Sequence, residues 1–122
     1  MKRDMDLARR VLGEIEAAPF DLGGVELSLP DVDDVSLQYH LLLLSEAGLI
    51  EVIDVSDMSG AAYIPVRLTW QGHEFVEAAR NESIWSKAKA AVAAKTGGMA
   101  FEVLSAVLKE YATRAVLNPS AV

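Results

Sequence analysis

The chain has 122 residues, enough for one ordinary domain with a hydrophobic core of its own. It contains no cysteine, which excludes a disulfide framework and a zinc site of the finger type. The N-terminal residues alternate charged and apolar side chains, and no apolar run is long enough to cross a bilayer. We therefore expect a cytoplasmic protein without membrane segments.

The formal net charge of -7 is distributed unevenly along the chain. Between Asp21 and Gly60 there are nine acidic residues and no lysine or arginine, whereas the part after Arg80 has a small excess of basic residues. A middle region with this charge disfavours contact with phosphate groups.

Apolar residues at helical spacing predict a first amphipathic helix from about Asp4 to Ala17. The pair Gly23-Gly24 then opens a loop. Apolar and polar residues alternate from Val25 to Leu29, which predicts a short, half-buried strand closed by Pro30.

The stretch from Val35 to Glu51 is the centre of the predicted fold, a leucine-rich helix that runs directly into a strand. Asp33 or Asp34 can cap its first turn, and acidic residues there complement the helix dipole. Gly48 is a natural C-terminal cap. We expect the core face of this helix to consist of four residues: Leu37, Leu41, Leu44 and Gly48.

A hairpin follows, with strands predicted from Ile50 to Val55 and from Ala61 to Leu68. Pro65 indicates that the second strand has a free edge. Thr69 is a predicted N-cap for a helix from Trp70 to Arg80.

Two further helices are predicted in the C-terminal part of the chain. Ser83 can cap the first, from Ile84 to about Lys95, and Gly97-Gly98 ends it. The second extends from about Ala100 to Val116, and residues 118–122 are expected to fray.

This order of elements predicts an α+β, mostly helical winged helix, with an abbreviated second helix and two extra C-terminal helices. We place the winged-helix core at residues 1–80 and the helical extension at 81–117. The extension either packs on the core or forms a dimer.

Four segments resemble a domain-of-unknown-function family of small bacterial and prophage-associated proteins. They are MKRDMDLARRVL (Met1 to Leu12), YHLLLLSEAGLI (Tyr39 to Ile50), LTWQGHEFVEAARNESIWSKAK (Leu68 to Lys89) and the pair Gly97-Gly98. The resemblance spans nearly the whole chain. It implies a winged-helix protein and brings no catalytic residue with it.

The central helix has the position of a DNA-recognition helix but lacks the side chains for that role. Opposite its core face lie Val35, Tyr39, Leu42 and Glu46. Only Gln38, at the margin, has the chemistry to read a base edge. The apolar members need cover, either as part of the core, which we favour, or from a protein partner.

DNA could instead contact a basic surface elsewhere. The candidates are Lys2, Arg3, Arg9, Arg10, Lys87 and Lys89. Because Asp6 stands four residues before Arg10, an ion-paired, solvated face is the simpler interpretation of the N-terminal bases.

The last helix has apolar residues at alternating spacings of three and four, the pattern of a packing seam. The seam residues are Phe101, Leu104, Leu108, Tyr111 and Ala115. This seam either closes a homodimer or packs on its own domain.

The residue patterns do not point to catalysis. His40 and His73 could share a metal with Glu74 or Glu77, but packed, hydrogen-bonded histidines are the commoner finding. There is no nucleophile elbow and no phosphate-binding glycine loop. We expect the two tryptophans, Trp70 and Trp85, to be buried.

We therefore predict a non-enzymatic winged-helix module that binds an unknown protein partner, with no metal or other cofactor. The alternative is a dimeric DNA-binding regulator that uses a basic surface other than the central helix.

Overall fold

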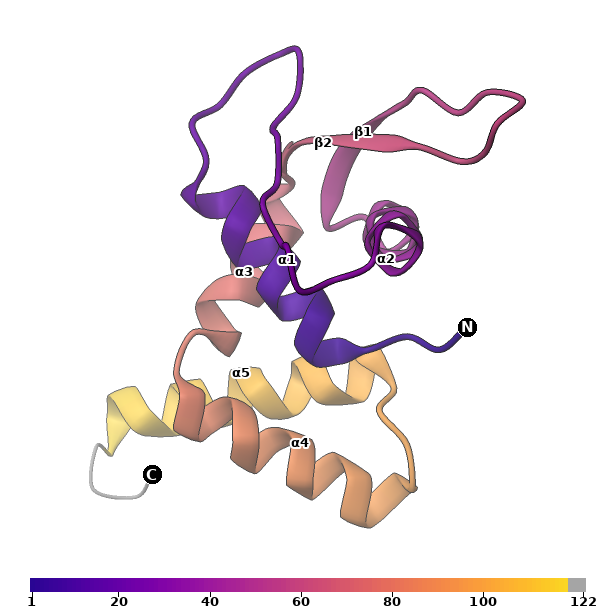
Figure 1. The fold of residues 1–122 in the computed structure, drawn as a ribbon. Coiled ribbons are helices and arrows are strands. Elements are labelled where there is room, and N and C mark those ends of the chain that lie inside the picture. Colours follow the sequence, from indigo (N-terminus) through magenta and orange to yellow (C-terminus); the bar gives the residue numbers. More distant parts are fainter. Residues whose placement is uncertain (119–122) are drawn as a thin grey trace. The chain divides into compact units, whose positions relative to one another are not determined.

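A computed structural model of the protein describes residues 1–118 (Figure 1). The described residues form five helices and one two-stranded antiparallel sheet, which confirms the mostly helical α+β class. The elements in order are α1 (Met5–Ala17), α2 (Asp34–Glu46), β1 (Ile50–Asp54), β2 (Tyr63–Leu68), α3 (Trp70–Ala79), α4 (Glu82–Thr96) and α5 (Phe101–Leu117).

The chain divides into two compact units. The first, unit 1, consists of Met1–Glu74, and the second, unit 2, begins at Phe75. The division falls inside α3, whereas the sequence placed it after residue 80.

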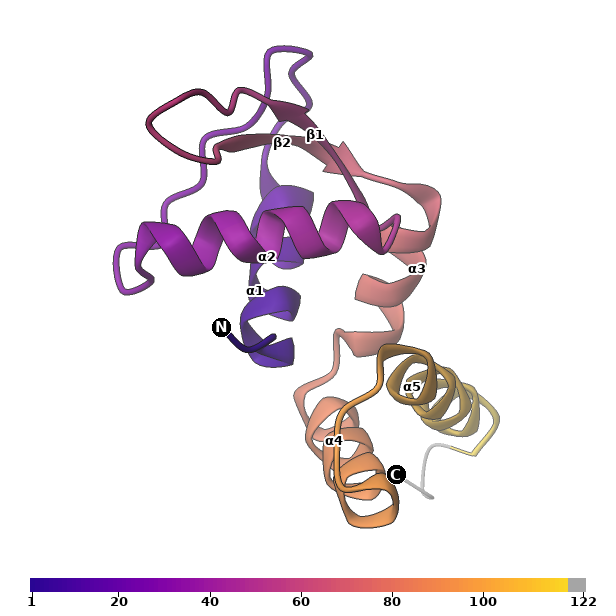
Figure 2. The same ribbon diagram turned by 90° about the vertical axis from the view of Figure 1, so that its right-hand side faces the viewer.

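In unit 1, α2 runs across α1 and the hairpin lies beside both helices (Figure 2). The side chain of Asp4 caps α1 by accepting hydrogen bonds from the backbone N–H groups of Asp6 and Leu7. The helix then buries one apolar stripe, made of Met5, Ala8, Val11, Leu12 and Ile15. This is the amphipathic pattern that the sequence predicted.

Helix α2 begins and ends as its sequence predicts. Asp33 caps it, with a side-chain oxygen 3.0 Å from the backbone nitrogen of Ser36. Gly48 follows the last turn with a φ of +74°, a left-handed conformation that favours glycine. Leu41 and Leu44 are buried as expected, but Leu37 is only half-buried.

Strands β1 and β2 pair from Ile50 opposite Leu68 to Asp54 opposite Tyr63. The register shifts between Glu51 and Val52, so Val66 is an extra residue in β2, as in a β-bulge.

The strand predicted over Val25 to Leu29 does not form. This segment makes one hydrogen bond to the hairpin, from the Val25 backbone N–H to the Pro65 carbonyl, at 2.7 Å. Its burial nevertheless alternates as predicted, with Val25 and Leu29 buried and Glu26 and Ser28 exposed. The alternation therefore predicted correctly which side chains are buried, but a hydrogen-bonded strand does not form there.

Helix α3 starts at the predicted cap, because the Thr69 hydroxyl accepts a hydrogen bond from the Gly72 N–H at 3.1 Å. Helix α4 starts earlier than predicted. Its cap is Asn81, whose side chain accepts from the Ile84 N–H at 3.0 Å, so the prediction of Ser83 was wrong. The helix ends at Gly97, which has a φ of +72°.

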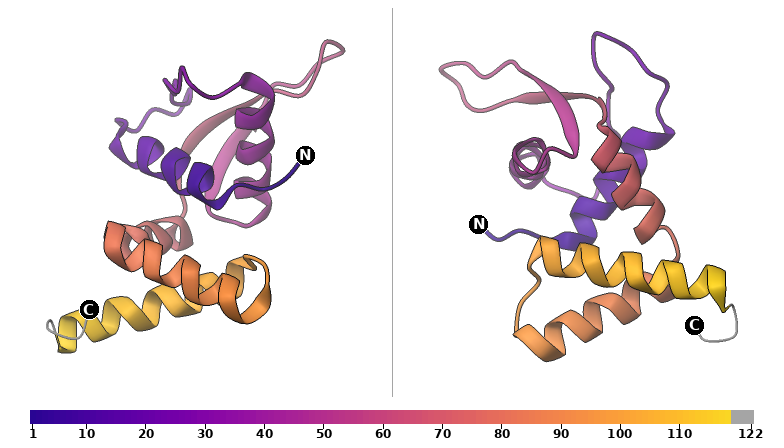
Figure 3. Two further views of the ribbon diagram at one scale, coloured as in Figure 1. Left: turned by 60° about the horizontal axis from the view of Figure 1, so that its bottom comes forward. Right: turned by 180° about the vertical axis from the view of Figure 1, so that it is seen from behind.

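In unit 2, α4 and α5 lie side by side and run in opposite directions (Figure 3). The ring of Phe75 contacts those of Trp85 and Phe101, with centroid distances of 6.2 and 5.2 Å. Trp85 is buried as expected, whereas Trp70, the first residue of α3 in unit 1, is 77% exposed.

Of the predicted frayed tail, residues 119–122 lie outside the described part of the chain. Within residues 1–118, no helix is long and apolar enough to cross a membrane.

Candidate functional site

One side of α2 carries the residues predicted as a protein interface, Val35, Tyr39, Leu42 and Glu46, here called the α2 face. Val35 is 64% exposed, Tyr39 and Leu42 are half-buried, and Glu46 is exposed. The favoured interpretation of the apolar members as core is therefore wrong for Val35. The helix turns His40, Leu41 and Leu44 toward the core instead.

Gln38 is held inside unit 1. Its side-chain oxygen accepts a hydrogen bond from the backbone N–H of Tyr63, in β2, at 2.7 Å. The side chain of α2 that we considered for base reading thus has a structural role, because it gives a hydrogen-bond partner to a backbone N–H at the edge of β2.

A cavity of about 370 Å³ lies between α2, β2 and the segment that precedes α2. We call it the α2–β2 groove. Its lining residues are Gly23, Gly24, Val25, Glu26, Leu27, Asp34, Leu37, Gln38, Leu41, Tyr63, Ile64 and Pro65. Most of them are apolar, and the two charged ones, Glu26 and Asp34, are acidic and exposed.

The groove exists because the third strand fails to form. In an antiparallel pair, a residue exchanges both an N–H and a carbonyl with its partner. Val25 donates to Pro65, but Pro65 has no N–H to return. The next outward N–H of β2, that of Tyr63, is taken by Gln38. The chain therefore leaves β2 after Val25 and an open space remains.

Gly24 fixes the place where the segment approaches the hairpin. It has a φ of +101°, and a Cβ atom there would lie 2.2 Å from Cγ2 of Ile64. Only glycine allows the backbone to pass so close to β2.

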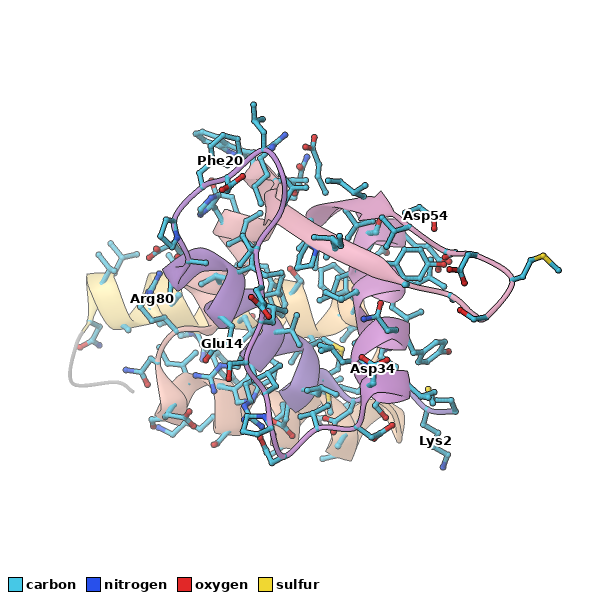
Figure 4. All side chains as sticks on the ribbon, turned by 45° about the horizontal axis from the view of Figure 1, so that its top comes forward. Lys2, Glu14, Phe20, Asp34, Asp54 and Arg80 are labelled. Carbon is cyan, nitrogen blue, oxygen red and sulfur yellow. The ribbon has the colours of Figure 1, made fainter. Side chains whose placement is uncertain are left out.

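The acidic side chains around α2 and the hairpin are held in their charged form. Hydrogen bonds from the backbone and side chain of Ser36 lower the pKa of Asp33. Side-chain and backbone hydrogen bonds from Ser56 lower the pKa of Asp54, which lies on the hairpin, away from Asp34 at the start of α2 (Figure 4). The surface of this part of unit 1 thus remains negative at neutral pH.

Asp31 makes an ion pair that the sequence did not predict. Its two carboxylate oxygens accept from Arg10 Nη1 and Nη2, at 2.7 and 2.6 Å. The hydrogen bonds from the guanidinium lower the pKa of Asp31 to about 2. Arg10 is therefore neutralised by Asp31, and the expected pairing with Asp6 misses this partner.

His40 is 2% exposed and engaged at both ring nitrogens. Nε2 accepts from the Asp4 backbone N–H at 2.9 Å, so the ring proton is on Nδ1, which donates to the Ser36 carbonyl at 2.8 Å. This confirms the packed, hydrogen-bonded histidine and leaves His40 no nitrogen for a metal.

His73 differs from the expectation of a packed side chain, because it is exposed on α3. In residues 1–118, no three histidine, cysteine, aspartate or glutamate side chains come together as metal ligands. The considered site with Glu74 or Glu77 is therefore not assembled there.

The candidate DNA-contacting residues lie in both units. Lys2 and Arg3 are exposed ahead of α1, and Arg9 is half-buried. In unit 2, Lys87 is exposed and Lys89 lies over the Trp85 ring, 5.5 Å from its centroid.

The predicted dimer seam contains both buried and accessible residues. Leu104 and Leu108 are fully buried within this single chain, whereas Phe101, Tyr111 and Ala115 are half-buried. The homodimer stays a prediction, and only these three half-buried residues could contribute to it directly.

Residues 2–99 match a family model described as "Hypothetical protein (DUF2513)". The chain belongs to the DUF2513 family. An uncharacterised protein of Haemophilus influenzae (strain ATCC 51907 / DSM 11121 / KW20 / Rd) is 35% identical over 111 residues, which cover 88% of this chain and 92% of that relative. No solved structure matches the chain.

DUF2513 membership confirms the resemblance to a domain-of-unknown-function family and brings no activity with it. The matched residues include α1 to α4 and therefore the whole α2–β2 groove, whereas α5 lies beyond them.

Sequence reasoning missed the groove and its two acidic residues. The available signals were Gly23-Gly24 and Pro65, which we interpreted as a loop and an edge marker. The missing information was the spatial relation between Gln38 and Tyr63, which are 25 residues apart.

Proposed function

We propose that this DUF2513 protein is a non-enzymatic winged-helix module of a bacterial or prophage system. It acts by binding a protein partner through the α2 face and the adjoining hairpin. The proposal has two parts, the fold type and the kind of partner, and different observations support them.

The order of elements supports the fold type. A winged helix has a first helix, a short strand, two further helices and a hairpin, and the short strand pairs with the hairpin in one sheet. Here α1 is followed by an extended segment whose Val25 N–H bonds to Pro65 of β2, where such a strand would join the sheet. The turn from Pro30 to Asp33 then replaces the second helix.

The partly exposed apolar surface of α2 is the observation that supports a protein partner. Val35 is 64% exposed and lies with half-buried Tyr39 and Leu42 on the side that a winged helix offers to DNA. Glu46 on the same side is exposed, and the sequence from residue 21 to 60 contains no lysine or arginine. DNA phosphates would be repelled there, whereas an apolar patch with a polar margin is typical of protein interfaces.

A capture experiment tests this proposal. The tagged full chain and a Val35→Ser, Glu46→Lys variant are used as baits in an extract of a bacterium that carries the gene. Both substituted residues are exposed, so the variant should remain folded. We expect the wild-type chain to retain a specific protein and the variant to retain about tenfold less. Substitution of central interface residues commonly costs more than about 1 kcal/mol of binding free energy, and about 1.4 kcal/mol corresponds to a tenfold change in affinity.

The matched control carries the same two chemical changes at exposed positions elsewhere, Val116→Ser and Glu74→Lys. It should retain as much of that protein as the wild-type chain. Equal loss in both variants, or equal retention in all three baits, would mean that the α2 face is not the binding surface.

A further inference from the structure

The α2–β2 groove lies on a different side of α2 from the α2 face. The groove uses Asp34, Leu37, Gln38 and Leu41 of the helix, and none of these belongs to the α2 face. Whatever occupies the groove therefore makes an interaction beyond the proposed function.

We propose that the α2–β2 groove binds a short extended peptide in which an apolar side chain is flanked by lysine or arginine. Three features of the groove support this occupant: its apolar floor, the charge of its rim and a backbone carbonyl at its edge.

The floor and the size of the groove fit one or two apolar side chains. About 370 Å³ is at the lower end of the range for ligand pockets, which is roughly 300–1,000 Å³. Leu37, from α2, is half-buried although the helix pattern places it on the core face, because it borders this space. Leu27 is half-buried on the opposite wall.

The rim supplies the charge complementarity. The charged residues of the lining, Glu26 and Asp34, are both acidic and exposed. Elsewhere in unit 1, the guanidinium of Arg10 is already paired with Asp31, at 2.6 Å. A lysine or arginine on each side of the apolar residue would complete the charge balance, whereas an acidic peptide would be repelled.

The edge of β2 provides the backbone recognition. Residues 63 and 65 direct their backbone groups away from β1, as shown by the bonds of Tyr63 N–H to Gln38 and of Pro65 carbonyl to Val25. The Tyr63 carbonyl has the same outward direction, and within residues 1–118 no hydrogen bond reaches it. An extended peptide can donate one N–H to this carbonyl, a minimal form of strand addition.

The hairpin of a second copy of this chain would fit the groove less well than a basic peptide. The large apolar side chain exposed at the hairpin tip is Met58, which directly follows Asp57 and stands four residues after Asp54. The acidic rim would repel both carboxylates. A basic peptide of another protein avoids that repulsion.

Selection from a phage-displayed library of random decapeptides tests the proposal, with the full chain as target. We expect the enriched peptides to share an apolar residue flanked by lysine or arginine. The best peptide, made synthetically, should perturb the amide resonances of Leu27, Leu37 and Tyr63 in an NMR titration.

Two groove variants and one control then locate the site. The change Glu26→Gln with Asp34→Asn removes both rim charges while keeping side-chain shape, and should weaken binding about tenfold, the sum of two exposed ion pairs. Leu37→Ala should weaken it at least as much. Val35→Ser with Glu46→Lys, on the α2 face, should leave it unchanged, so that failure of this proposal and of the proposed function can be told apart.

A peptide N-methylated at the apolar residue should also bind more weakly, because it cannot donate to the Tyr63 carbonyl. The proposal is overturned if the enriched peptides are acidic or neutral, if none is enriched, or if the groove variants bind as the wild-type chain does. Self-association of the chain that Leu37→Ala abolishes, measured by sedimentation, would overturn it in favour of a second copy.

Discussion

His40 joins the start of α1 to the first turns of α2. Its ring accepts from the Asp4 N–H and donates to the Ser36 carbonyl, and it is 2% exposed. The residue looked like a potential metal ligand in the sequence only because histidine has both uses. Two hydrogen bonds and near-complete burial decide for the structural one.

We predict that His40→Ala lowers the free energy of unfolding by about 2–3 kcal/mol, because it leaves a cavity and removes the partner of the Asp4 N–H. Urea unfolding followed by circular dichroism measures this change. His73→Ala is the control, because His73 is exposed and its loss should change stability by less than about 0.5 kcal/mol. Similar losses in the two variants would contradict the role assigned to His40.

The ion pair between Arg10 and Asp31 predicts a pH dependence of stability. The pair lowers the pKa of Asp31 from 3.8 to about 2 in the folded chain, mainly through the hydrogen bonds from Arg10. A lowered folded-state pKa contributes stability that is complete above the unfolded value and is lost as the pH falls through the folded value. Asp31 should therefore lose its stabilising effect between pH 3.8 and about 2.

NMR titration of the Asp31 carboxyl carbon tests this, with Arg10→Gln as the variant. We expect the Asp31 pKa to return toward 3.8 in the variant, and the stability difference from the wild-type chain to shrink as the pH falls toward 2. Arg67→Gln, which removes the ion pair of Arg67 with Glu51, should leave the Asp31 titration unchanged. If the Asp31 pKa were the same in the wild-type chain and in Arg10→Gln, the ion pair would be absent in solution.

At the scale of elements, the close approach of α3 to the end of α2 depends on a helical glycine. A Cβ atom at Gly72 would lie 2.0 Å from the carbonyl oxygen of Leu49. That oxygen accepts the hydrogen bond from the Thr69 N–H, at 2.9 Å, which holds the start of α3. The methyl group of alanine would therefore push α3 away from Leu49 and disturb the hydrogen bond between Thr69 and Leu49.

Gly72→Ala should lower the free energy of unfolding by about 1–3 kcal/mol through overpacking. Gly13→Ala is the matched control, because Gly13 also lies inside a helix and a Cβ there has no atom within 4 Å. The control should stabilise the chain by about 0.5–1 kcal/mol, since alanine favours helix over glycine. Thermal unfolding measures the change in stability of each variant. A Gly72→Ala variant that is more stable than the wild-type chain would refute the close contact.

The helices were largely predictable because their signals are local. Periodicity gave α1 to α5 within a few residues, and Thr69, Gly48 and Gly97 act as the expected caps or ends. Ser83 failed as a cap because Asn81, two residues earlier, is an equally good capping residue in the required position.

The groove was not predictable because it results from two non-local facts. The alternation in residues 25–29 is correct for burial, but a ladder also requires a partner strand with free N–H groups. Pro65 lacks one and Gln38 takes the other, and no local pattern reports the second contact. Exposure of Val35 was missed similarly, since a helical wheel does not say which elements cover its outer side.

At the scale of the whole molecule, the acidic middle of the sequence falls entirely inside unit 1. Two arginines of that unit, Arg10 and Arg67, are paired with carboxylates, at 2.6 and 2.7 Å. Residues 1–74 contain five basic and fourteen acidic residues, a formal charge of -9, and the excess of two basic residues in the rest of the chain reduces it to the net charge of -7. Such a distribution favours protein or peptide partners with basic surfaces over nucleic acid.

We predict that the full chain does not shift random-sequence duplex DNA in a gel at low salt, up to about 10 μM protein. Proteins that neutralise phosphates bind non-specific DNA with a Kd of roughly 10⁻⁴–10⁻⁶ M at physiological salt, and tighter as salt is lowered. Low salt therefore gives the DNA alternative its best opportunity. A shift that weakens steeply with added salt would contradict the prediction and revive the regulator.

If such a shift appears, two variants assign it to a unit. Lys2→Ala with Arg3→Ala removes exposed bases of unit 1, and Lys87→Ala with Lys109→Ala does the same in unit 2. The pair that contacts phosphate should reduce the slope of log K against log salt by about one for each lysine or arginine lost, and the other pair should leave it unchanged. Neither pair touches the α2 face or the α2–β2 groove, so both variants should still bind their protein and peptide partners as the wild-type chain does.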